Sequence, residues 1–331
     1  MSPREPGSDG TMEDTRAAAI GASTHAYVDD PRNATVLISV NGKLVPRPEA
    51  TVSVLDAGFV LGDGVWEGLR VLDGGIGFLD QHLVRLYEGA HALRIDIGLT
   101  PAELTARLFA CLSANEMRDG VHIRLMVTRG LKRTPYQDPR VTIGPATVVI
   151  IPEYKSPSPE IAKRGLKLFT VHVRRSGPDV QDQKLNSHSK LNCILACIQA
   201  TEAGADEALM LDDRGAVATC NSTHFFIIRR GELWTSGGMH CLGGITRGNI
   251  LRVAREAGIP AFERDFSLVD VYGADEAFCT GTFAGVTPVR MVDGRAIGFR
   301  SAPPADGAAG PITRRLGELY KALAMREVTR P

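Results

Sequence analysis

Apolar residues recur along this chain with two different periods, and the segments that carry them are mixed throughout its length. Short alternating runs predict strands, whereas longer runs with spacings of three and four predict helices. For residues 34–151 the pattern predicts a small α+β domain. We expect strands over Val36–Val40, Val65–Val71, His122–Thr128 and Ala146–Ile151, and helices over His82–Arg94, with Asp80 as its N-cap, and Pro101–Asn115.

The end of this domain is marked by residues 152–162, which contain three prolines and two serines. That composition is typical of an interdomain linker. A second, larger domain is predicted over residues 163–331. Its expected strands are Leu166–Val173, Glu207–Leu211, His224–Arg229 and Ala277–Thr280, and its expected helices are Leu191–Ala203 and Gly248–Ala257. Residues 1–33 are polar and lack a sustained period, which predicts a loosely ordered extension.

Composition argues against several classes of partner. The chain has 331 residues, of which 44% are hydrophobic, so it can bury a large core. Lys+Arg and Asp+Glu both number 38, which gives no electrostatic case for nucleic acid or an anionic membrane. We find no apolar run of membrane-spanning length and no apolar core of a signal peptide, which predicts a cytoplasmic protein. The six cysteines lack CxxC spacing, which predicts neither a disulfide framework nor a metal site.

Three segments offer groups that bind anions. Arg85 lies in the first turns of a predicted helix, and a guanidinium can bind a phosphate through two parallel hydrogen bonds. The segment Gly243–Arg247 leads into a helix whose N-terminus directs backbone N–H groups at an anion. Gly281, between Thr280 and Thr282, offers similar donors. Together they predict one phosphate bound from both domains, although each alone also fits a solvated arginine or an ordinary turn.

The same segments carry a family resemblance. The chain contains, in this order, GDGVWEGLR, HLVRL, DEALMLD, GGITR and ADEAFCTGTFAGVTPV. This set resembles the fold-type IV pyridoxal 5'-phosphate enzymes, which include branched-chain and D-amino acid aminotransferases, R-selective amine transaminases and aminodeoxychorismate lyases. The resemblance covers Val36–Leu319. It implies a two-domain fold of α+β and α/β type, a cofactor in the larger domain, an active site between the domains and a homodimer.

The resemblance also implies which residues contact the cofactor. They are Arg85, Thr219, Asn221, Ile245, Thr246, Thr282 and Phe283. Thr219 stands where the family has a glutamate, whose carboxylate keeps the pyridine nitrogen protonated. A hydroxyl can only form a hydrogen bond with that nitrogen. We therefore expect a weaker electron sink, which favours concerted 1,3-proton transfer or chemistry such as elimination that needs less carbanion stabilisation.

An enzyme of this family needs a lysine that bonds to the cofactor and moves a proton, and its pKa must be lowered. Two lysines precede the predicted helix, in QDQKLNSHSKLNCILA. Lys184 matches the family spacing with about a one-residue insertion. Lys190 falls where branched-chain enzymes have a tyrosine that touches the cofactor's phenolic oxygen. We expect Lys184 to form the bond and Lys190 to lie near that oxygen, with the reverse assignment left open.

The first domain is expected to line the substrate pocket. His122 and Arg124 are two residues apart on a predicted strand, so they share a face. By resemblance they fall at substrate-binding positions, as do Trp66 and Arg133. Surface positions for Arg124 and Arg133 are the alternative. A basic lining favours a carboxylated substrate over a simple amine.

Three functions remain compatible with the sequence. The first is a transaminase that moves an amino group between an amino acid, of branched-chain or D-amino acid type, and a 2-oxo acid. The second is a pyridoxal phosphate-dependent lyase of the aminodeoxychorismate lyase type, which Thr219 favours. The third is a protein that binds the cofactor and has lost catalysis.

Overall fold

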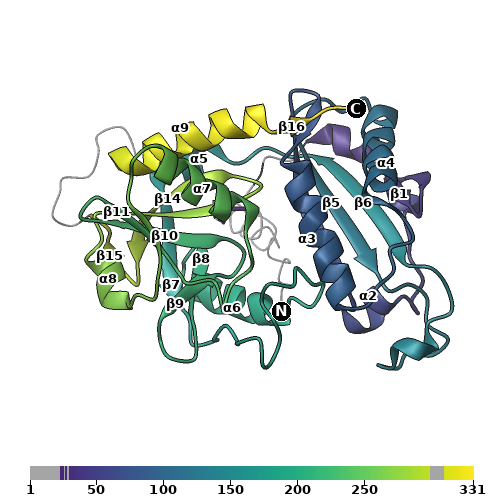
Figure 1. Ribbon diagram of the computed structural model, residues 1–331, viewed down its shortest axis with the longest axis horizontal. Helices are drawn as coiled ribbons and strands as arrows, with labels where there is room; N and C mark the ends of the chain where they lie inside the picture. The colour runs from purple at the N-terminus through teal and green to yellow at the C-terminus, as the bar shows by residue number, and fades with distance from the viewer. Residues whose placement is uncertain (1–22, 26, 28–29, 299–308) are drawn as a thin grey trace, which may run out of the picture.

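The computed structural model describes residues 23–25, 27, 30–298 and 309–331, and its strands form two sheets (Figure 1). The first sheet has seven strands, all paired antiparallel. Their spatial order is β16 (Val328–Thr329), β4 (Gly75–Gly77), β3 (Gly64–Leu72), β5 (Val121–Thr128), β6 (Thr147–Tyr154), β1 (Leu37–Val40) and β2 (Lys43–Pro46). Helices α3 (Leu79–Ala92) and α4 (Pro101–Ala114) share one hydrophobic core with this sheet.

Shorter elements complete this half of the molecule. They are α2 (Ala57–Leu61) and three 3-10 helices, η1 (Pro31–Thr35), η2 (Arg47–Glu49) and η3 (Pro139–Val141). Leu69 of β3, Leu86 of α3 and Leu104 of α4 are buried together in the core. The alternation of β3 therefore turns the other side chains of this strand, including Trp66 and Arg70, toward the opposite face of the sheet.

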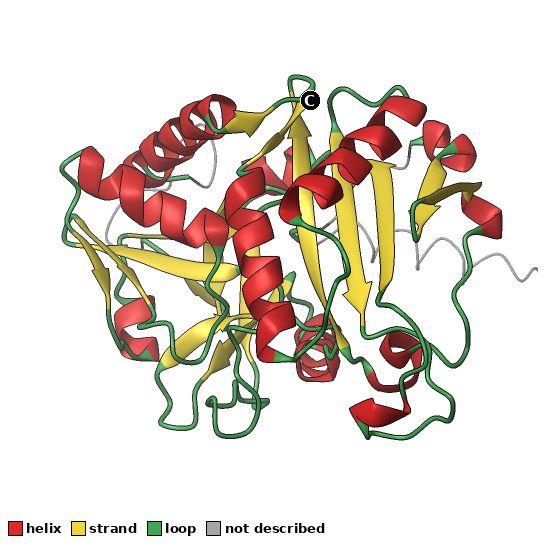
Figure 2. Cartoon of the chain, turned by 45° about the vertical axis from the view of Figure 1, so that its right-hand side comes forward, coloured by secondary structure: helices red, strands yellow, loops and turns green. Residues whose placement is uncertain are grey.

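The second sheet has nine strands and mixes parallel with antiparallel pairs. The spatial order is β12 (Ala261–Glu263), β11 (Glu232–Thr235), β10 (His224–Arg229), β13 (Glu276–Gly281), β14 (Gly285–Val292), β7 (Leu166–Thr170), β8 (Glu207–Leu211) and β9 (Val217–Cys220), with β15 (Arg295–Ala296) paired to β14. Helices surround it: α5 (Pro159–Arg164), α6 (Leu191–Glu202), α7 (Ile245–Glu256), α8 (Leu268–Tyr272) and α9 (Pro311–Arg326) (Figure 2).

The predicted elements are largely present, with their ends shifted. The predicted N-cap Asp80 is wrong, because α3 begins at Leu79 after Phe78, whose backbone is left-handed with φ of 53°. Asp80 instead lies in the first turn, where its charge faces the positive end of the helix dipole. Helix α7 begins at Ile245, earlier than predicted, so the glycines at 243 and 244 lie directly at its N-terminus.

The end of the chain returns to the first sheet. Helix α9 packs on the second sheet, and β16 then pairs with β4 through Val328 and Thr329. Neither element was predicted from the sequence pattern. Most of the extension expected over residues 1–33 lies outside the described residues. Among the helices that are described, none combines the length and hydropathy needed to cross a membrane.

Candidate active site

Arg85 is held against a buried carboxylate. From α3, its Nε and Nη2 donate to the two oxygens of Glu67 on β3, at 2.8 and 2.6 Å. The Nδ1 of His82, one helical turn earlier, lies 2.6 Å from the same carboxylate. The spacing of three on α3 aims both side chains at the strand. The geometry therefore does not support a solvated arginine on the helix surface.

The protonation states in this cluster follow from its burial. Burial raises the pKa of Glu67, but hydrogen bonds from His82 and Arg85 outweigh it and hold the pKa below its ordinary value. For His82, burial lowers the pKa more than Glu67 raises it. His82 is therefore neutral near pH 7, and its Nδ1–H donates to the carboxylate. The guanidinium of Arg85 is fixed in one orientation as a result.

The third nitrogen of the Arg85 guanidinium contacts the turn before α7. Its Nη1 donates to the carbonyl oxygen of Gly243 at 2.8 Å. Gly244 is the N-cap of α7, and no described side chain caps this helix, so the first N–H groups are open to an anion. Thr246 in the first turn is buried, with its hydroxyl 3.2 Å from that of Tyr320. Guanidinium, amides and hydroxyl together form a donor set that fits a phosphate.

A histidine lies under the same turn. The Nε2 of His224 donates to the carbonyl oxygen of Leu242 at 2.8 Å, and burial lowers the pKa of His224 to about 3. A Cβ at Gly244 would lie 2.3 Å from Cε1 of this ring. Only glycine fits at position 244, so the neutral imidazole and the turn are packed as one unit.

Lys190 is a partly buried amine at the start of α6. Its Nζ lies 3.3 Å from Oδ1 of Asn186 and 5.4 Å from the centre of the Trp66 ring. Burial lowers the pKa of Lys190 to about 8, and nearby arginines, Arg175 foremost, add to the effect. A cavity of about 220 Å³ opens beside Lys190 and extends to Leu242, the residue before the turn at the start of α7.

Lys184 lies in a different environment. Its side chain is exposed, and its backbone N–H donates to Asp182. Asn186, between the two lysines, is hydrogen-bonded to β3. Its side-chain amide donates to the carbonyl oxygen of Trp66 at 2.6 Å, and its backbone carbonyl oxygen accepts from the Trp66 N–H at 2.9 Å. This pairing turns the chain so that Lys190, and not Lys184, faces the cavity.

Thr219 and Asn221 both make hydrogen bonds within the second sheet. The hydroxyl of Thr219 is buried and donates to the carbonyl oxygen of Thr223 at 2.8 Å. The Asn221 side chain accepts from the backbone N–H of Ala208 at 2.8 Å. Both side chains therefore stabilise the turn between β9 and β10.

The predicted substrate residues of the first sheet meet the second sheet. His122 and Arg124 share a face of β5, and the Arg124 guanidinium lies 3.8 Å from the centre of the Trp66 ring. His122 meets Phe283 edge to face, with ring centres 5.7 Å apart. Phe283 and Thr282 belong to the turn between β13 and β14. Burial and the surrounding cations lower the pKa of His122 to about 3, so it is neutral.

Two further cations in this region were missed by the sequence reasoning. Arg70 donates to the carbonyl oxygen of Lys155 at 2.5 Å, and both side chains lie over Phe283, at 5.5 and 5.1 Å from its ring centre. Arg70 lies four residues after Trp66 on β3, so the alternation of the strand places both side chains on one face. This pattern could have identified Arg70 from the sequence. We call the cations Arg70, Arg124 and Lys155, together with the neutral His122, the basic wall.

Arg133 does not join this group. Its side chain is exposed, and its backbone N–H donates to the carbonyl oxygen of Val141 at 2.9 Å. Within the described part of the chain, no contact connects it to the basic wall.

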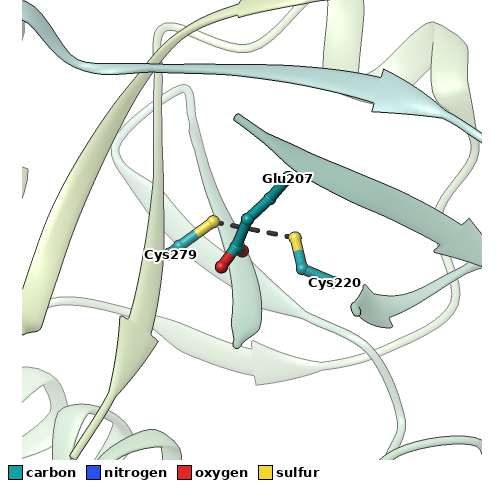
Figure 3. Close-up of side chains that lie close together, drawn as sticks. All are labelled: Glu207, Cys220 and Cys279. Atoms are coloured by element: carbon teal, nitrogen blue, oxygen red, sulfur yellow. Dashed lines mark hydrogen bonds between the residues drawn. The ribbon is translucent and has the colours of Figure 1, made fainter. Parts of the chain in front are cut away.

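Glu207 forms a second buried cluster with two thiols. Figure 3 shows its carboxylate beside Cys220 and Cys279, whose sulfurs lie 3.7 Å apart. The three residues are close enough to share a metal ion. The carboxylate, however, already accepts the hydroxyls of Ser222 and Thr223, at 2.7 and 2.5 Å. Both oxygens of Glu207 are therefore engaged by hydroxyl groups, and the cluster is held by hydrogen bonds.

Known proteins resemble this chain over most of its length. A model of the family described as amino-transferase class IV matches residues 64–292. The chain is 38% identical to branched-chain-amino-acid aminotransferase-like protein 2 of Arabidopsis thaliana, over 88% of its own length and 51% of that protein, so it spans about half of that relative. It is 41% identical to a putative branched-chain-amino-acid aminotransferase of Methanocaldococcus jannaschii, over 86% of this chain and 95% of the relative.

A solved structure also resembles this chain. It is the T.th. branched-chain amino acid aminotransferase with pyridoxamine 5'-phosphate, which superposes with a TM-score of 0.81 and 32% identity. The match covers 89% of this chain and 98% of the other.

Proposed function

Because the chain belongs to the class IV aminotransferase family, we propose that it is a pyridoxal 5'-phosphate-dependent transaminase that moves an amino group between an amino acid, of branched-chain or D-amino acid type, and a 2-oxo acid. The observation that carries the proposal is the placement of Lys190. It is a partly buried amine whose pKa is lowered to about 8, and it lines a cavity that extends to Leu242, the residue before the turn at the start of α7. The fold-type IV architecture expected from the resemblance is confirmed.

The residues present fit the phosphate and aldehyde ends of this cofactor. Arg85, the amides of Ile245 and Thr246, and the hydroxyls of Thr246 and Thr282 would hold the phosphate. When bound, pyridoxal phosphate supplies an aldehyde that amines attack and a ring that withdraws electrons from the substrate Cα. Lys190 would supply the amine for the aldehyde, and its Nζ would hold and move the proton of the substrate Cα.

The basic wall supports a carboxylated substrate. Burial lowers the pKa of Arg70 and Arg124, but not enough to remove their charge near pH 7. Both arginines are partly buried, and neither has a bidentate carboxylate partner among the residues that the structure describes, which favours the binding of an anion between the two sheets. The partners we propose are therefore small amino acids and 2-oxo acids.

A cytoplasmic location stays a prediction.

The lyase alternative has one observation in its favour. The Thr219 hydroxyl donates its hydrogen to the carbonyl oxygen of Thr223, so that hydrogen is not offered to a pyridine nitrogen. Thr219 also carries no charge with which to stabilise a pyridinium. Electron withdrawal by the ring is then weaker than in enzymes with a glutamate at this position.

A half-reaction assay separates these functions. We expect the purified holoenzyme to lose the absorption of its cofactor aldehyde on mixing with one class of amino acids from a panel of L- and D-enantiomers, and to regain it on addition of a 2-oxo acid. A lyase would instead release pyruvate or ammonia without consuming a 2-oxo acid. A spectrum that responds to no amino acid would contradict both functions and favour a protein that only binds the cofactor.

We also propose that the enzyme is a homodimer in which α6 lies at the interface. Four large apolar residues form one stripe along this helix, at spacings of three, four and seven: Leu191, Ile194, Leu195 and Ile198, which are 67%, 52%, 46% and 48% exposed. A stripe of this kind on an otherwise folded chain marks a surface that another protein covers. Because Lys190 is the N-cap of α6, a partner on this helix also supports the active site.

Charges on this stripe should separate the protomers. We expect the double variant I194D/L195D to sediment as a monomer in analytical ultracentrifugation, because two carboxylates cannot be buried unpaired in an apolar interface. Val269 of α8 offers a matched control, since it is also apolar and 74% exposed. V269D should leave the dimer intact. A wild-type protein that is already monomeric at micromolar concentration would contradict the assignment.

A further inference from the structure

The described residues of the N-terminal segment, 23–25 and 27, lie between the two halves of the site. Tyr27 forms an antiparallel bridge with Pro157, and the Lys155 ammonium lies 4.4 Å from the centre of the Tyr27 ring. Lys155 also belongs to the basic wall and lies over Phe283. The segment therefore runs along the edge of the region to which we assign the substrate.

Thr24 fixes this segment to the second sheet. It is buried, and its hydroxyl donates to Oε1 of Glu207, the oxygen that also accepts from Ser222. Burial raises the pKa of Glu207, and the hydrogen bonds from Ser222, Thr223 and Thr24 oppose that rise. A buried carboxylate needs hydrogen-bond donors around it. Ser222 and Thr223 of the second domain donate two hydroxyls to Glu207, and Thr24 donates the third.

His25 follows Thr24 and stacks on Phe283. The ring centres are 6.1 Å apart, and the planes are inclined by only 18°. The His25 side chain is exposed, and partial desolvation by neighbouring groups lowers the pKa of His25 to about 4, with further contributions from the charges of Lys155 and Arg124. His25 is therefore neutral near pH 7 and adds shape, not charge, to the region around Phe283.

The remaining space behind this stack is small. The cavity lined by Thr24, His25, Thr280 and Phe283 has a volume of about 10 Å³, enough for about one water molecule. A substrate side chain that extends past Phe283 on this side would meet the imidazole of His25.

We propose that residues 23–25 and 27 form a wall of the substrate pocket and that His25 is a specificity-determining residue, which excludes amino acids with bulky side chains. The inference rests on the proposed function, because Phe283 borders a substrate only if the site binds one against the basic wall. Pocket shape of this kind discriminates between side chains by steric exclusion and not by charge.

Binding of unreactive acids tests the proposal without relying on turnover. Isothermal titration calorimetry on the purified holoenzyme would compare butyrate, 4-methylvalerate and 4-phenylbutyrate. For wild type we expect affinity to fall sharply at 4-phenylbutyrate. In His25→Ala the affinity for 4-phenylbutyrate relative to butyrate should rise about tenfold, because the volume of the imidazole becomes available. Thr24→Val should shift this ratio in the same direction, since the segment loses its bond to Glu207.

His91→Ala serves as the matched control, because His91 is an exposed histidine of α3. It should leave the ratio at the wild-type value. A ratio in His25→Ala equal to that of wild type would overturn the proposal, and so would tighter binding of all three acids alike, which would mean that the segment merely obstructs the site. Failure of borohydride to attach the cofactor to either Lys190 or Lys184 would instead count against the proposed function, because the binding ratios do not depend on that bond.

Discussion

Replacing Lys190 by alanine is expected to abolish the covalent attachment of pyridoxal phosphate and to lower turnover by about 10³-fold or more. Lys190 lines the cavity, and its Nζ lies 5.4 Å from the centre of the Trp66 ring, whereas Lys184 is exposed. Mass spectrometry of peptides from borohydride-reduced holoenzyme would locate the modified lysine. We expect a pyridoxyl group on Lys190 in wild type and none in Lys190→Ala.

The matched control is Lys184→Ala, which should keep both the adduct and most of the activity. The pH dependence provides a further check. Because burial lowers the pKa of Lys190 to about 8, the rate of adduct formation from apoprotein and cofactor should rise with pH and level off above about 9. An adduct on Lys184, or a rate that still climbs steeply at pH 10, would contradict the assignment.

Replacing Glu67 by glutamine should cost about 3 kcal/mol of unfolding free energy at pH 7. Glu67 is fully buried and accepts hydrogen bonds from both His82 and Arg85, so its loss leaves the guanidinium of Arg85 without a countercharge. Arg85 would also lose its fixed orientation toward Gly243, and we expect weaker binding of the cofactor phosphate. Urea unfolding followed by circular dichroism measures the first effect, and cofactor titration of the apoprotein measures the second.

The sign of the pH dependence follows from the direction of the shift. The pKa of Glu67 is lower in the folded state than its ordinary value of 4.5, so its stabilisation is complete above about pH 4.5 and is lost as the pH falls through the folded pKa. The difference between wild type and Glu67→Gln should therefore shrink below pH 4.5. Glu153→Gln is the control, since Glu153 pairs with Arg47 at the surface and should cost less than about 1 kcal/mol. Equal losses in both variants would contradict the buried network.

Local patterns in the sequence predicted much of the fold. The alternation of β3, the spacing of α3 and the glycines before α7 each depend on neighbouring residues, and all three elements are present. Helix α9 and β16 were not predicted. The two-residue strand β16 has no periodicity of its own, and it exists only because the edge of β4 is open to it. The pairing of β16 with β4 depends on the tertiary structure, so a local sequence pattern cannot predict it.

In the site, too, local motifs could be identified from the sequence, whereas contacts between distant residues could not. Arg85 was identified from its motif, but its partner Glu67 lies 18 residues away on another element, and only the crossing of α3 over β3 brings them together. Counting residues favoured Lys184, whereas the structure places Lys190 at the cavity, four residues after the Asn186 that pairs with Trp66; which lysine bonds to the cofactor stays a prediction. Arg133 matched a position in the family, yet its loop carries the side chain to the surface.

The position of β16 has a consequence for the integrity of the active site. Strand β4 lies between β16 and β3, and β3 carries Glu67 and Trp66. Loss of the last few residues would therefore remove the outermost strand of the sheet that carries Glu67, the carboxylate that orients Arg85. A fragment cut between β6 and β7 would be incomplete for the same reason, since its first sheet would lack a strand that only the distal end of the chain provides.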